Sequence, residues 1–62
     1  GISLTKYIQH ERIREALRLF NTTDFSVSDV AIMVGYQDFS YFSKLFSGEV
    51  GMSPRVYKRQ GK

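Results

Sequence analysis

The residue types that catalyse reactions or hold metal ions are scarce in this sequence. His10 is the only histidine, and the chain contains no cysteine. His10 falls on the expected solvent side of the first helix, with no paired carboxylate nearby to complete an acid–base or nucleophilic set. No spacing of metal ligands is present either. We therefore predict that the chain is not an enzyme and has no metal or cofactor site.

The basic residues gather at the two ends of the chain. The net charge is +3, and the segment 21–38 carries only acidic charges. This distribution suits a polyanion such as nucleic acid or a membrane surface, although a solvated basic surface would give the same pattern. The cationic residues at the two ends are Lys6, Arg12, Arg14 and Arg18, then Lys44, Arg55, Lys58, Arg59 and Lys62.

Neither a membrane segment nor a secretion signal is visible. No apolar run approaches the roughly 20 residues that are needed to cross a bilayer. The absence of cysteine fits a reducing compartment. We expect a cytoplasmic protein that does not act at a membrane.

The periodicity predicts an all-α fold, a small bundle of about four helices. Ser3 is a suitable N-cap for a helix that ends near Phe20. Within 1–20, apolar residues recur at spacings of three and four and predict one buried stripe. The stripe consists of Leu4, Tyr7, Ile8, Ile13, Ala16, Leu17 and Phe20.

Arg12 interrupts this stripe. A long arginine stem can cover apolar surface while its guanidinium binds a carboxylate. We therefore interpret Arg12 as structural, with Asp29 or Asp38 as its expected partner. A contact with a DNA phosphate is the alternative.

Two further helices within 26–50 form the pattern of a helix-turn-helix. Ser26 can cap the first of them, and Gly35 supplies the positive φ of a tight C-terminal turn. Asp38 can cap a second helix that runs from Phe39 to about Val50. Two short helices joined by a few residues that include glycine are typical of this motif. Ser53-Pro54 then begins a final helix over 53–60.

The second helix of the motif has two distinct faces. At about 100° per residue, Phe42, Leu45 and Phe46 share one arc, which we assign to the core. The opposite, outward face carries Ser40, Ser43, Lys44 and Ser47. Small hydroxyls and one cation could enter a major groove closely, although a merely solvated face would have the same composition.

These patterns predict a set of DNA contacts. Phe39 lies at one edge of the outward face and could touch a thymine methyl, while the Tyr41 hydroxyl could donate to a phosphate. We predict that the recognition helix is about 39–50 and that it lies in the major groove. The candidate DNA-binding residues are Gln37, Phe39, Ser40, Tyr41, Ser43, Lys44, Arg55 and Lys58.

The chain also contains a weak internal repeat with a period of 50 residues. Gly1-Ile2-Ser3-Leu4 and Tyr7 match Gly51-Met52-Ser53-Pro54 and Tyr57 at the same spacing. The repeat suggests that residues 1–20 end one unit and residues 53–60 end the next. We therefore expect 1–62 to be a single helix-turn-helix subdomain, one half of a tandem DNA-binding domain.

The same residues resemble a known family. The resemblance is to the second helix-turn-helix of AraC/XylS bacterial transcription regulators, and residues 7–16 resemble that family's linker helix. It implies sequence-specific binding of double-stranded DNA, a missing upstream helix-turn-helix and a separate sensor domain. Base contacts carried over by position fall on Phe39, Ser40, Ser43 and Lys44. The matching stretches are 26–31 (SVSDVA), 34–38 (VGYQD), 40–44 (SYFSK), Phe46, Gly51, Ser53-Pro54 and Tyr57-Lys58.

An interaction module is the alternative function. The helix-turn-helix shape could bind a protein partner such as RNA polymerase instead of, or in addition to, DNA. Such binding needs an exposed apolar patch, for which the sequence offers Ile32, Met33 and Met52.

Overall fold

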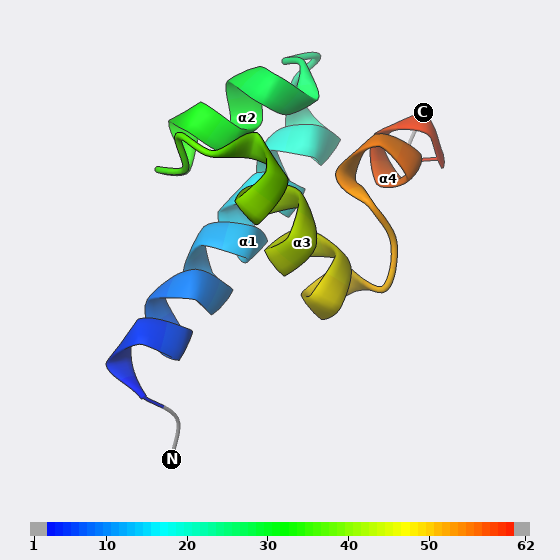
Figure 1. The fold of residues 1–62 in the computed structure, drawn as a ribbon. Helices are drawn as coiled ribbons and strands as arrows, with labels where there is room; N and C mark the ends of the chain where they lie inside the picture. The colour runs from blue at the N-terminus through cyan, green and yellow to red at the C-terminus, as the bar shows by residue number, and fades with distance from the viewer. Residues whose placement is uncertain (1–2, 61–62) are drawn as a thin grey trace.

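The computed structural model describes residues 3–60, which form four α-helices and no strand (Figure 1). They are α1 (Leu4–Thr22), α2 (Val27–Met33), α3 (Phe39–Val50) and α4 (Pro54–Gln60). The predicted all-α class and the helix count are confirmed. Gly1 and Ile2 of the predicted repeat, and Lys62, lie outside the described residues.

Each helix begins where a polar side chain caps its free amides. The Ser3 hydroxyl accepts from the Lys6 amide at 3.2 Å, and the Ser26 hydroxyl accepts from the Asp29 amide at 3.1 Å. The Asp38 carboxylate accepts from the first turn of α3, and the Ser53 hydroxyl accepts from the first turn of α4 at 3.3 Å. Every N-cap that the sequence predicts is therefore confirmed.

Two glycines end α2 and α3 in the left-handed region. Gly35 has φ 105° and Gly51 has φ 91°. A Cβ at such angles would crowd the backbone, which is why glycine is favoured there. Gly35 thus allows the tight turn that ends α2 and leads the chain into α3.

A chain of aromatic rings forms the centre of the core. Phe42 and Phe46 of α3 have no exposed surface. Phe46 meets Phe20 of α1 edge to face at 5.7 Å between centroids, and Phe42 packs on Tyr36 at 5.7 Å. Burying each such ring contributes about 1.5–3 kcal/mol. The remaining buried residues are Ile13, Ala16, Leu19, Val30, Ala31 and Val34 of the same core cluster, and Pro54 at the start of α4.

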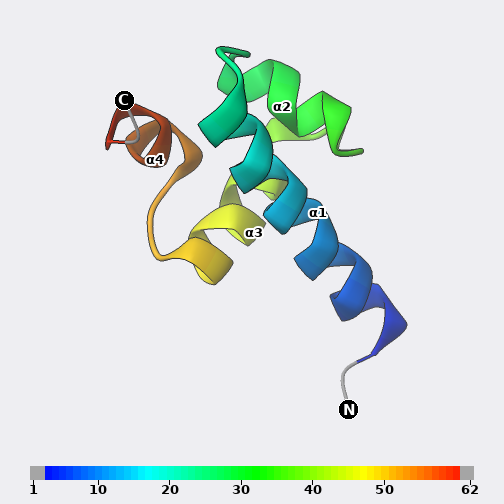
Figure 2. The same ribbon diagram turned by 180° about the vertical axis from the view of Figure 1, so that it is seen from behind.

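The predicted stripe of α1 is buried only in its C-terminal half, so this prediction was wrong for the first turns. Leu4, Tyr7 and Ile8 are 73%, 51% and 39% exposed. The reason is geometric, because α2 and α3 pack against the later turns and the first turns project beyond them (Figure 2).

Arg12 also differs from its predicted role. Its guanidinium lies over the Tyr36 ring, 5.3 Å from the centroid, and neither Asp29 nor Asp38 pairs with it among the described residues. The Asp38 carboxylate instead accepts the amides of Ser40 and Tyr41. Arg12 therefore supports the turn by a cation–π contact rather than an ion pair.

Candidate nucleic-acid interface

Burial of one face of α3 determines which residues of this helix face outward. Phe42 and Phe46 fix the rotation of α3 because both are fully buried. Asp38 fixes where the helix begins. Ser40 and Lys44 then lie exposed on the side away from the core.

The other predicted base-contacting residues are less accessible. Ser43 and Ser47 are half-buried. Phe39 is also half-buried, packed against the core with its ring 6.4 Å from that of Phe42. The most accessible part of the outward face is therefore Ser40 and Lys44.

Two predicted contacts lie near the start of α3. Gln37 is exposed in the turn before the helix. Tyr41 is 45% exposed, and its ring packs edge to face on Tyr36 at 5.8 Å. Its hydroxyl accepts a hydrogen bond from Nε2 of Gln9 on α1 at 3.0 Å.

The basic residues of α4 form a separate cluster. Arg55 and Lys58 border a cavity of about 430 Å³ together with Arg59 and Val27, the first residue of α2. Arg59 belongs to this α4 cluster although it is absent from the predicted set. Its position four residues after Arg55 and next to Lys58 was a signal that could have included it.

Two aromatic contacts anchor α4, one to α3 and one to α1. The Tyr57 ring lies 5.8 Å from Phe46 and 6.1 Å from Phe20. Its hydroxyl exchanges hydrogen bonds with the side-chain amide of Asn21 on α1. In the ribbon, α4 lies on one side of α3, and the first turns of α1 lie on the other (Figure 1).

Ion pairs neutralise two of the cations on α1. Arg14 pairs with Glu11 at 3.8 Å, and the Nε of Arg18 donates to Glu15 at 3.0 Å. The hydrogen bond from Arg18 lowers the pKa of the Glu15 carboxyl. These arginines carry less net field toward a polyanion than an unpaired cation would.

His10 has a carboxylate partner that its sequence neighbourhood does not reveal. Its Nδ1 lies 2.8 Å from Oε2 of Glu49, 39 residues away on α3. The expectation of no carboxylate near His10 was therefore wrong. The pair joins α1 to α3 on the surface. Within residues 3–60, no group of three or more His, Cys, Asp and Glu side chains is arranged to hold a metal ion.

The two helices α2 and α3 are both capped and are joined by a turn that contains a glycine. The second of them has one buried face and turns a polar face outward. This arrangement defines the helix-turn-helix class of protein. In agreement, the family model described as a helix-turn-helix domain matches residues 1–60. The curated relatives include the HTH-type transcriptional activator RhaR of Yersinia pseudotuberculosis (strain IP 31758), 35% identical over 97% of this chain. RhaR of Cronobacter sakazakii is 33% identical over the same share.

The chain therefore belongs to the AraC-type helix-turn-helix family, as the resemblance implied. Membership makes it a DNA-binding domain of the transcription-regulator class, which is generally non-enzymatic. The chain spans 21% of the length of these relatives. No solved structure matches it. None of the helices in the described part is long and apolar enough to cross a membrane.

Proposed function

We propose that the chain binds double-stranded DNA sequence-specifically, with α3 in the major groove, as part of a bacterial transcription regulator. The supporting observation is that α3 exposes Ser40 and Lys44 while its opposite face is fixed by Phe42 and Phe46. The major groove admits an α-helix and presents a distinct set of donors and acceptors at each base pair. Because bacterial DNA lies in the cytoplasm, this proposal also places the protein there.

The residues divide into two roles. Ser40, Ser43 and Lys44 would contact base edges, with Gln37 and Phe39 at the rim of the groove. Arg55, Lys58 and Tyr41 would contact phosphates, which set orientation and register without carrying sequence information.

Lys44 provides the first test. We expect Lys44→Ala either to reduce the slope of log Kd against log salt by about one unit, if Lys44 contacts a phosphate, or to relax base preference, if it contacts guanine. The measurement is fluorescence anisotropy at several salt concentrations, with duplexes selected from a random library and with random duplexes. Arg14→Ala is the matched control, because it removes one charge from the outer side of α1, where Arg14 already pairs with Glu11. Affinity that does not depend on salt would contradict DNA binding by this chain.

We expect the isolated chain to bind weakly. A single small unit makes few phosphate contacts, so its Kd should lie near the non-specific range, roughly 10⁻⁴–10⁻⁶ M. Nanomolar, sequence-specific binding by these 62 residues alone would be inconsistent with a role as one half of a tandem DNA-binding domain.

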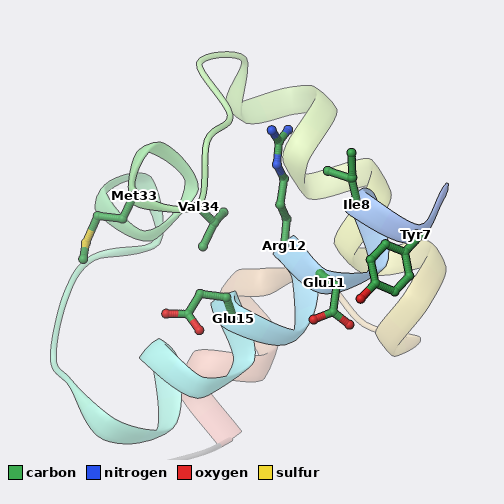
Figure 3. Close-up of a pocket in the computed structure, with 7 residues that line it drawn as sticks. All are labelled: Tyr7, Ile8, Glu11, Arg12, Glu15, Met33 and Val34. Atoms are coloured by element: carbon green, nitrogen blue, oxygen red, sulfur yellow. The ribbon is translucent and has the colours of Figure 1, made fainter. Parts of the chain in front are cut away.

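The upstream helix-turn-helix is the occupant that we propose for an exposed apolar surface, the apolar flank, formed by Tyr7, Ile8 and Met33. Leu4 and Ile32 are exposed as well. A cavity of about 330 Å³ lies between α1 and α2 on this side (Figure 3). Its walls carry Tyr7, Ile8, Met33 and Val34 together with the charged side chains of Glu11, Arg12 and Glu15. The matched relatives are several times longer than this chain, so they have sequence that could supply an upstream helix-turn-helix and a sensor domain. Met52, which the sequence suggested for such a patch, is half-buried.

Hydroxyl-radical footprinting of the parent protein tests this occupant. We expect Tyr7 and Met33 to be labelled in the 62-residue chain and protected in the parent protein, since both are about half exposed here. Tyr41 serves as the control and should be labelled in both. Protection that appears only when RNA polymerase is added would replace the upstream unit by polymerase as the occupant.

A further inference from the structure

Arg12 differs from the other arginines of α1 in its electrostatic surroundings. Arg14 and Arg18 each pair with a glutamate on α1. Arg12 has no carboxylate partner among residues 3–60, and its guanidinium rests on the Tyr36 ring. A guanidinium held by a ring face keeps its N–H groups available for a planar or tetrahedral anion.

Tyr41 presents a donor beside this guanidinium. Because the Tyr41 oxygen accepts from Gln9 Nε2 at 3.0 Å, its own hydrogen is left to donate elsewhere. The Tyr41 and Tyr36 rings are in contact at 5.8 Å, so Arg12 and Tyr41 share Tyr36 as a common support.

The two groups border the same cavity, which we call the Arg12 cavity. It has a volume of about 330 Å³ and no carboxylate on its walls. It lies between the first turns of α1 and the start of α3. The residues that line it are Thr5, Ile8, Gln9, Arg12, Tyr36 and Tyr41.

The position of the Arg12 cavity relative to α3 indicates what it would meet. A helix in the major groove lies between two phosphate backbones, and the groove is about 12 Å wide. In the ribbon, α4 lies on one side of α3 and the first turns of α1 lie on the other (Figures 1 and 2). The α4 cluster belongs to the first of these helices, whereas the Arg12 cavity is lined by Thr5, Ile8 and Gln9 of the first turns of α1. On the surface of α3, Tyr41 is only about 60° from Lys44, at about 100° per residue.

We propose that Arg12 and Tyr41 together bind one phosphodiester of the DNA backbone, on the wall of the groove opposite to the α4 cluster. This inference rests on the proposed function, because it requires α3 to enter the groove. It makes α1 a DNA-contacting helix as well as a connecting one. The guanidinium supplies the charge, and the hydroxyl supplies a second hydrogen bond that fixes the phosphate at the start of α3.

The test compares five variants of the 62-residue chain by anisotropy over a range of salt concentrations. Arg12→Met keeps an apolar stem over Tyr36 but removes the charge, and we expect the salt slope to fall by about one unit. Arg14→Met makes the same charge change on the same helix and should leave the slope unchanged. Tyr41→Phe keeps the ring and should weaken binding about tenfold with the slope intact, as expected for a lost hydrogen bond to a charged group.

The double variant Arg12→Met with Tyr41→Phe tests whether one phosphate is shared. If both side chains hold the same group, the double variant should weaken binding by less than the product of the single effects. Far-ultraviolet circular dichroism of each variant checks folding. Arg12→Lys keeps the positive charge and should retain most of the salt slope of the unmodified chain. It thereby separates the loss of charge in Arg12→Met from the loss of packing on Tyr36.

The outcomes separate this inference from the proposed function. A slope for Arg12→Met equal to that of Arg14→Met, with unchanged affinity for Tyr41→Phe, would overturn the shared phosphate site while Lys44→Ala still reported DNA binding. Salt-independent affinity of the unmodified chain would overturn both proposals.

Discussion

Replacing each of the three described glycines by alanine should change the free energy of unfolding, raising it at Gly48 and lowering it at Gly35 and Gly51. Gly48 lies inside α3, and a Cβ placed there meets nothing within 4 Å. Glycine in a helix interior costs about 0.5–1 kcal/mol relative to alanine, because its unfolded backbone is freer. Gly48→Ala should therefore raise the free energy of unfolding by about that amount.

Gly51→Ala should have the opposite effect with equally open surroundings. Its φ of 91° lies in the left-handed region, and again no atom lies within 4 Å of an added Cβ. The cost is thus backbone strain alone, about 1–2 kcal/mol. Gly48 and Gly51 are matched, since only the backbone angle distinguishes them.

Gly35→Ala combines that strain with a neighbour. At φ 105°, its added Cβ would lie 3.4 Å from Cζ of Arg12. That distance is ordinary contact with the end of a flexible side chain, so we expect a loss similar to that of Gly51→Ala, with little added by crowding. Combining Gly35→Ala with Arg12→Met should therefore give nearly additive changes.

Thermal melting followed by circular dichroism measures all three. One kcal/mol corresponds to about 4–8 °C in Tm for a domain of this size. Gly48→Ala should melt several degrees higher than the unmodified chain, and the other two variants several degrees lower. Shifts of the same sign for Gly48→Ala and Gly51→Ala would refute the reasoning, because added apolar bulk rather than backbone angle would then decide stability.

Further stability predictions concern buried or capping groups, each measured by urea denaturation. Tyr36→Phe should stabilise the fold by about 1 kcal/mol, because the Tyr36 hydroxyl is buried with no hydrogen-bond partner in the described part of the chain. Tyr57→Phe is its matched control and should cost about 0.5–1.5 kcal/mol, because that hydroxyl is bonded to Asn21. Asp38→Ala should cost about 1 kcal/mol through loss of the α3 N-cap. Phe46→Ala should cost about 3–5 kcal/mol, a large part of the roughly 3–9 kcal/mol expected for a chain of this length.

The helix boundaries and the inward face of α3 could be predicted because their causes are local in the sequence. Ser26 and Asp38 cap amides two or three residues away, and Gly35 acts through its own φ. The rotation of α3 follows from the spacing of Phe42 and Phe46 within one helix. Sequence periodicity carries this information directly.

Contacts between helices could not be predicted in the same way. His10 and Glu49 are 39 residues apart, and Gln9 and Tyr41 are 32 residues apart. Their pairing depends on the crossing of α1 and α3, which no spacing within either helix encodes. Asp29 and Asp38 were the expected carboxylate partners of Arg12, but Asp38 caps α3 and the Arg12 guanidinium lies over the Tyr36 ring.

The two halves of the apolar stripe on α1 differ in burial, and the sequence pattern could not predict this difference. Spacings of three and four show that one face of a helix is apolar, but they do not show what covers it. Ile13 and Phe20 are covered by the helices of this chain, whereas Leu4 and Tyr7, on the same helix, are about half exposed or more. Exposed apolar residues in this density favour a covering partner over a solvated surface. The contrast between the two halves of α1 is therefore what an interface with a second unit at the start of α1 would produce, as we propose for the apolar flank.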